Sequence, residues 1–117
     1  MKVLVVEDSN TRRGKLVEYF RSRGHQVLET DTCATALAML SANPDVQLIT
    51  WDGALADGRS DQAIMNLSDG GFRGSMVAAS GGRSDRRSQM AEGCIAEIDP
   101  EDPATWPSAL DTLLSER

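Results

Sequence analysis

The sequence has 117 residues, of which 40% are hydrophobic and 26% are charged, and its formal net charge is −6. This length fits one globular domain, which we expect to span residues 1–117. The negative charge argues against direct binding to nucleic acid or to an anionic membrane surface. No apolar run reaches the roughly 20 residues that cross a bilayer. We expect no signal peptide and a cytoplasmic protein, in which Cys33 and Cys94 stay reduced and serve as small apolar side chains.

The first half of the chain alternates apolar runs with helical periodicity. Residues 2–6 are predicted to form a strand, since Val3 to Val6 are an unbroken apolar run, typical of a strand buried on both faces of a parallel sheet. A helix is expected between the capping residues 9–11 and a stop at Gly24. Residues 26–30 alternate in polarity and predict a second, less buried strand. The helix that follows carries an apolar stripe of Cys33, Leu37 and Leu40.

The second half continues the alternation. Residues 46–51 predict a third strand, and a loop at residues 53–58 leads into a short helix. Residues 75–80 and 94–98 predict the fourth and fifth strands. A last helix then begins near residue 103 or 107, and its buried stripe consists of Leu110, Leu113 and Leu114.

The segment between the fourth and fifth strands is unusual. Residues 81–92 include three arginines, but only Met90 and Ala91 are apolar. A helix there has little to bury, so we expect it to be short or mobile. Its arginines are either a solvated face or a docking surface for an acidic partner.

Five strands alternating with up to five helices predict an α/β fold. We expect a doubly wound five-stranded parallel sheet in the flavodoxin-like order 2-1-3-4-5, with helices on both faces. This order places the first and third strands side by side, so that Glu7, Asp8 and Asp52 gather at one edge, with Ser80 nearby. Any one of these acids could be a helix cap or a solvated side chain. Three acids at two neighbouring strand ends favour a binding site.

Three carboxylates in one cleft repel each other, and without a counterion at least one pKa should rise. Carboxylate, carbonyl and water oxygens suit Mg²⁺. We therefore expect Mg²⁺ to be held by Glu7, Asp8 and Asp52, together with the backbone carbonyl of Ala54. A carboxylate beside Mg²⁺ can attack a phosphoryl group, and Ser80 could hydrogen-bond the phosphoryl oxygens. The site thus suggests phosphoryl transfer to Asp52.

These residues resemble the receiver domain of two-component response regulators, the chemotaxis-regulator-like family, and the resemblance covers the whole chain. The run that ends in Glu7 and Asp8 is similar to the family's first strand and acidic pair. Asp52 and residues 53–58 resemble the phospho-acceptor and its loop, and Ser80 matches the Ser/Thr switch residue. The resemblance implies that Asp52 accepts a phosphoryl group from a histidine kinase or a phosphotransfer protein. It implies a monomer or weak dimer whose own chemistry is limited to self-phosphorylation from small donors and slow self-dephosphorylation.

The chain departs from the family pattern at several positions. Asp99 stands where the family has a lysine that contacts the phosphoryl group, and Ala96 or Glu97 stands where the family has an aromatic switch. Ala56 replaces a usual proline. Asp99 would repel the phosphoryl group if it faced the site, or it could turn away and cap the last helix.

These departures leave an alternative function open. The chain could be an atypical receiver that acts as a protein-interaction module independently of phosphorylation. A small hydrolase using the same acids is a third possibility, but the chain offers no lid to exclude water.

Overall fold

One parallel sheet forms the centre of the computed structural model, which describes residues 1–115. The strands are β1 (Lys2–Val6), β2 (Gln26–Thr30), β3 (Val46–Trp51), β6 (Ser75–Ala78) and β7 (Ala96–Glu97). They lie in the order β2-β1-β3-β6-β7, and every neighbouring pair is parallel. The predicted order 2-1-3-4-5 is confirmed.

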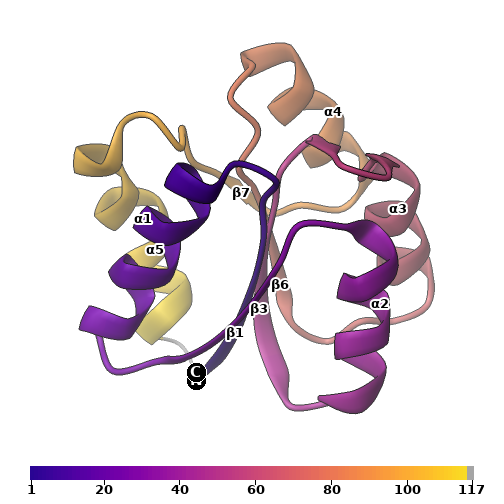
Figure 1. The fold of residues 1–117 in the computed structure, drawn as a ribbon, viewed down its shortest axis with the longest axis horizontal. Helices are drawn as coiled ribbons and strands as arrows, with labels where there is room; N and C mark the ends of the chain where they lie inside the picture. Colours follow the sequence, from indigo (N-terminus) through magenta and orange to yellow (C-terminus); the bar gives the residue numbers. More distant parts are fainter. Residues whose placement is uncertain (116–117) are drawn as a thin grey trace.

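Helices cover both faces of this sheet (Figure 1). On one face lie α1 (Asn10–Ser22) and α5 (Trp106–Ser115), and on the other lie α2 (Cys33–Ala42), α3 (Asp61–Asp69) and α4 (Arg83–Glu92). The alternation of side chains along β1 divides the core in two. Val3 and Val5 pack with the residues of α1 and α5, whereas Leu4 and Val6 pack with those of α2 and α3.

Helix α1 follows from local signals that the sequence displays. Ser9 caps its first turn, because the Ser9 side chain accepts a hydrogen bond from the Arg12 backbone N–H at 3.3 Å. Its inward face is Leu16, Val17 and Phe20, all buried as expected. Burying each side chain of this kind contributes about 1.5–3 kcal/mol before chain entropy is subtracted.

Helix α2 is rotated relative to the predicted stripe. Ala36 is its buried residue, while Leu37, which we expected to face inward, is 40% exposed. The partly buried side chains that pack beside Ala36 include Cys33, Met39 and Leu40. The helix thus meets the sheet through a small residue, and the position one step further along the helix turns away from the sheet.

Helix α4 corrects the expectation of a short segment between residues 81 and 92. It runs for ten residues and buries two polar side chains in place of apolar ones, Arg86 and Gln89. Arg86 Nη1 donates to the carbonyl of Ser80 at 2.9 Å, and Gln89 Nε2 donates to the carbonyl of Trp51 at 2.8 Å. These bonds satisfy backbone groups at the ends of two strands. The other two arginines, at positions 83 and 87, are exposed.

The loop predicted at residues 53–58 contains a small antiparallel hairpin of β4 (Ala54–Leu55) and β5 (Gly58–Arg59). Gly58 has a φ of 128°, a conformation that favours glycine. Asp57 in the turn reaches across to α2, where its carboxylate accepts the backbone N–H groups of Cys33 and Ala34 at 2.9 and 3.0 Å. A short 3₁₀ helix, η1 (Pro103–Thr105), precedes α5. Within residues 1–115, no helix is both long and apolar enough to span a bilayer.

Candidate functional site

The acidic residues are positioned by the strands that precede them. The Glu7 backbone N–H donates to the carbonyl of Thr30 at 3.0 Å, and the Asp52 N–H donates to the carbonyl of Val6 at 2.9 Å. These bonds continue the sheet one residue past β1 and β3, so both acids are held at its carboxyl edge. Glu7 is fully buried and Asp52 is 5% exposed, while Asp8 between the two strand ends is exposed.

Glu7, Asp8 and Asp52, called the acidic cluster below, each present a carboxylate oxygen within 4.8 Å of the others. The predicted gathering of these three side chains therefore occurs. Glu7 Oε2 accepts the Ser9 N–H at 3.1 Å, but its other oxygen, Oε1, is buried without a hydrogen-bond partner among residues 1–115. A buried orphan oxygen beside two further carboxylates fits a hard divalent cation, which takes oxygen ligands.

Burial and crowding shift the protonation of the cluster. Burial first, and then the hydrogen bond that a protonated Glu7 can share with Asp52 and the charge of Asp52, raise the pKa of Glu7 to about 8. Burial also raises the pKa of Asp52, as does Asp8, while the hydrogen bond with Glu7 opposes the rise. Near neutral pH a protonated Glu7 can thus donate to Asp52, and a bound cation would take the place of that proton.

Ser80 lies beside the chain that carries Asp52. It is buried two residues after the end of β6, and a Cβ atom added to Gly53 would come within 2.9 Å of the Ser80 Oγ. Only glycine at position 53 permits this close approach. The Ser80 hydroxyl donates to Asp85 Oδ2 of α4 at 3.3 Å and accepts the Gly82 N–H at 3.4 Å.

Two predicted site residues take part in local structure. Ala54 pairs with Arg59 in the β4–β5 hairpin, and its carbonyl as a metal ligand stays a prediction. The Asp99 carboxylate accepts the Glu101 backbone N–H at 2.9 Å, and the Asp99 carbonyl accepts the indole N–H of Trp106 at 2.7 Å. Asp99 thus stabilises the turn before η1, rather than capping the last helix.

One cation at this edge of the sheet was missed by sequence reasoning. The Arg12 side chain of α1 forms an ion pair with Glu101, and both its terminal nitrogens lie 3.1 Å from where a Cβ on Gly81 would stand. The first turn of α1 contains no acidic residue. A basic residue there opposes the helix dipole, and this local conflict was the signal that could have drawn attention to Arg12.

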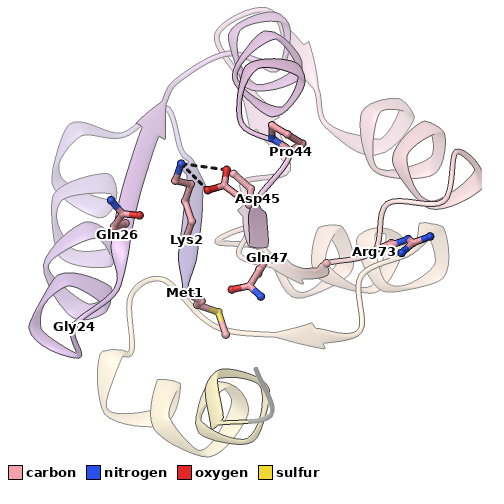
Figure 2. A pocket seen from close by; sticks show the side chains of 10 residues that line it. Met1, Lys2, Gly24, Gln26, Pro44, Asp45, Gln47 and Arg73 are labelled. Atoms are coloured by element: carbon pink, nitrogen blue, oxygen red, sulfur yellow. Dashed lines mark hydrogen bonds and ion pairs between the residues drawn. The ribbon is translucent and has the colours of Figure 1, made fainter.

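A surface hollow of about 580 Å³ lies at the opposite, amino end of the strands (Figure 2). Its lining includes Lys2, Gln26, Asp45 and Gln47. Lys2 Nζ is paired with Asp45 Oδ2 at 3.0 Å, so these two charges compensate each other. Because it lies at the amino ends of the strands, the hollow is separate from the acidic cluster at their carboxyl ends.

No family model and no curated protein matches the sequence. Solved structures do match it. The receiver domain of the TMAO respiratory system response regulator TorR is 24% identical, with a TM-score of 0.82 over 98% of this chain and 97% of that one. A response regulator receiver domain (CheY-like) from Methylobacillus flagellatus is 21% identical, with a TM-score of 0.82 over 97% of this chain and 98% of that one.

A putative two-component system response regulator/GGDEF domain protein is 22% identical, with a TM-score of 0.79 over 97% of this chain. The present chain spans 50% of the length of that protein. The fold is therefore that of response regulator receiver domains, and the resemblance inferred from the acidic pair, Asp52 and Ser80 is confirmed at the level of the fold.

Proposed function

We propose that this chain is a phosphorylatable receiver domain of a two-component phosphorelay, with Asp52 as the phospho-acceptor. The observation that carries the proposal is the acidic cluster, in which three carboxylate oxygens lie within 4.8 Å of one another at the carboxyl edge of the sheet. Like charges gathered in a largely buried place are costly unless a cation or a reaction uses them. The receiver fold of the similar solved structures supports this interpretation.

The donor set of the acidic cluster fits Mg²⁺. Glu7, Asp8 and Asp52 would hold the ion, directly or through its waters, with the Ala54 carbonyl as a further ligand. When bound, Mg²⁺ supplies positive charge that offsets the carboxylates and the incoming phosphoryl oxygens.

The chemistry at Asp52 is a simple displacement. A carboxylate oxygen of Asp52 attacks the phosphorus of a phosphohistidine on a histidine kinase or phosphotransfer protein. The new P–O bond makes an acyl phosphate, while the P–N bond breaks and the imidazole nitrogen keeps the electron pair and takes up a proton. Ser80, which lies next to Gly53, would hydrogen-bond a phosphoryl oxygen once its bond to Asp85 is exchanged. The chain performs no further reaction beyond accepting phosphate from small donors and slowly losing it in the cytoplasm.

The test is incubation with acetyl phosphate and Mg²⁺, followed by intact-mass measurement. We expect the wild-type chain to gain one phosphate and Asp52→Asn to gain none. Asp45→Asn, which removes an equal charge at the other end of the sheet, should label like the wild type. No labelling of the wild type, either from small donors or from a phosphorylated phosphotransfer protein, would contradict the proposal.

An atypical receiver that works as an interaction module without phosphorylation is the second candidate. Asp99 in place of the family lysine and the non-aromatic β7 strand, whose residues are Ala96 and Glu97, favour it. This candidate predicts that the Asp52→Asn variant keeps every interaction of the wild-type chain. A phosphorelay receiver instead loses any interaction that depends on phosphorylation.

A further inference from the structure

Arg12 is a cation that the structure brings to the acidic edge of the sheet from α1. Its guanidinium nitrogens lie against the backbone of Gly81, the residue after Ser80, and its Nε pairs with Glu101 in the loop after β7. Besides Glu101, the charges of Glu7 and Asp52 raise the pKa of Arg12, which places its charge within their field. The Arg12 side chain is 32% exposed, so solvent and a ligand can both reach it.

The position of Arg12 is poorly explained by the helix on which it stands. Arg12 and Arg13 occupy the first turn of α1, where the helix dipole disfavours positive charge and where no acidic residue compensates. Arg13 has local partners: it donates to the carbonyl of Glu7 at 2.8 Å and to Glu29 at 3.3 Å. Arg12 instead extends its side chain to Gly81 and Glu101, in the loops that follow β6 and β7.

The loop after β7 is where the resembling family places its lysine, and here that loop is acidic. Asp99 is used within the turn, by accepting the N–H of Glu101. The Glu101 side chain, in contrast, points to Arg12 and pairs with it. The loop therefore holds a cation in position instead of contributing one.

We propose that Arg12 supplies the positive charge for the phosphoryl group on Asp52, in the role that the absent lysine would have, and that Glu101 and the lack of a side chain at Gly81 position it. This inference rests on the proposed phosphoryl transfer. Ser80 and Gly81 follow β6, with Ser80 beside Gly53 and Gly81 beside the Arg12 guanidinium. A phosphoryl group on Asp52 would therefore have the Ser80 hydroxyl and the Arg12 guanidinium as neighbours. A guanidinium stays charged and offers five N–H donors, two of which can bind two phosphoryl oxygens at once.

The first test compares labelling rates with acetyl phosphate and Mg²⁺. Arg12→Ala is compared with Arg21→Ala, which removes an equal charge from the last turn of the same helix. We expect Arg12→Ala to label at least tenfold more slowly than the wild type, a loss of about 1.4 kcal/mol in the transition state. Arg21→Ala should label within about twofold of the wild type. Equal rates for the two variants would overturn the inference and leave the proposed function intact.

The second test separates contact with the phosphoryl group from a structural role. Fluoroberyllate, which mimics an acyl phosphate without covalent transfer, is titrated in the presence of saturating Mg²⁺, and Mg²⁺ is titrated alone. Arg12→Ala should bind fluoroberyllate at least tenfold more weakly, yet bind Mg²⁺ equally or more tightly, because one positive charge beside the acidic cluster is gone. Weakening of both affinities would mean that Arg12 only maintains the structure, and would refute the inference. A wild-type chain that neither labels nor binds fluoroberyllate would refute the proposed function and this inference together.

Discussion

The two ends of the central sheet differ in how their charged side chains are arranged. At the amino end, Lys2 Nζ lies 3.0 Å from Asp45 Oδ2 and 3.2 Å from Asn43 Oδ1, so opposite charges are paired at the rim of the hollow (Figure 2). At the carboxyl end, Glu7 and Asp52 are buried beside each other and beside Asp8. The same strands, β1 and β3, connect the two ends.

The difference lies in what each charge arrangement does to the stability of the fold. Paired charges at a surface cost little and need no ligand. Buried like charges lower the free energy of unfolding, since Glu7 must be kept protonated or the repulsion tolerated. An arrangement that costs stability persists when a ligand uses it, which makes the acidic cluster, rather than the hollow at the amino end, the candidate functional site.

The largest expected effect concerns Mg²⁺ affinity at the carboxyl end. Asp8→Asn removes one charge from the acidic cluster and should weaken Mg²⁺ binding by at least about tenfold, because the ion loses a full charge among its nearest oxygens. The measurement is the fluorescence of Trp51, which adjoins Asp52, in a Trp106→Phe background that removes the second tryptophan. Calorimetry provides an independent check. If the wild-type chain showed no saturable response to Mg²⁺, the prediction that the acidic cluster binds the ion would be wrong.

The next effect concerns stability in the absence of metal. Glu7→Gln should raise the free energy of unfolding near neutral pH by about 1–3 kcal/mol, because a glutamine amide can donate to Asp52 without the protonation that Glu7 needs. Urea denaturation in the presence of a chelator measures it. The same variant should gain less stability from added Mg²⁺ than the wild type does. A destabilised Glu7→Gln would show that the buried carboxyl serves the fold after all.

A smaller effect is expected at Asp57. It tests whether a carboxylate stabilises the fold when it has hydrogen-bond partners, even though it lies at the same end of the sheet as the acidic cluster. Asp57 lies in the loop after Asp52, yet its carboxylate is paired with the N–H groups of Cys33 and Ala34, which lower its pKa from the usual 3.8. A group with a lowered pKa stabilises the fold above its unfolded pKa, and this contribution is lost as the pH falls through the folded pKa. Asp57→Ala should therefore melt at a lower temperature than the wild type at pH ~7.

The gap between the two melting temperatures should close as the pH falls from about 3.8, the usual pKa, through the lower folded pKa of Asp57, because the wild-type carboxylate is then protonated. Thermal melts followed by circular dichroism across this range provide the measurement. A gap that stays constant with pH would mean that the charge of Asp57 contributes nothing to the cap.

The smallest effect is expected at the amino end. Asp45→Asn breaks the ion pair with Lys2, but Asp45 is exposed and an exposed pair contributes little. We expect a change in urea midpoint close to the error of the measurement and an unchanged Mg²⁺ affinity. A large loss of stability in this variant would contradict the expectation that the exposed ion pair at the amino end contributes little to the free energy of unfolding.

The sequence by itself determined the sheet and the acidic cluster. The apolar run of residues 3–6, the alternation with helices and the acids after two strands sufficed, because parallel strands in this order bring their carboxyl ends to one edge. These signals are local and periodic, so they can be read along the chain. The confirmed order of the strands then follows from general rules of α/β topology.

Only the tertiary structure decided which side chains complete the site and its surroundings. The pairing of Arg12 with Glu101 joins α1 to a loop 89 residues later, and Gln89 of α4 reaches the carbonyl of Trp51 at the end of β3. The composition of residues 81–92 predicted a weak helix because buried polar side chains look like solvent-facing ones in a sequence. Their partners are backbone groups on distant elements, and neither periodicity nor spacing along the chain encodes which of those groups lies within reach.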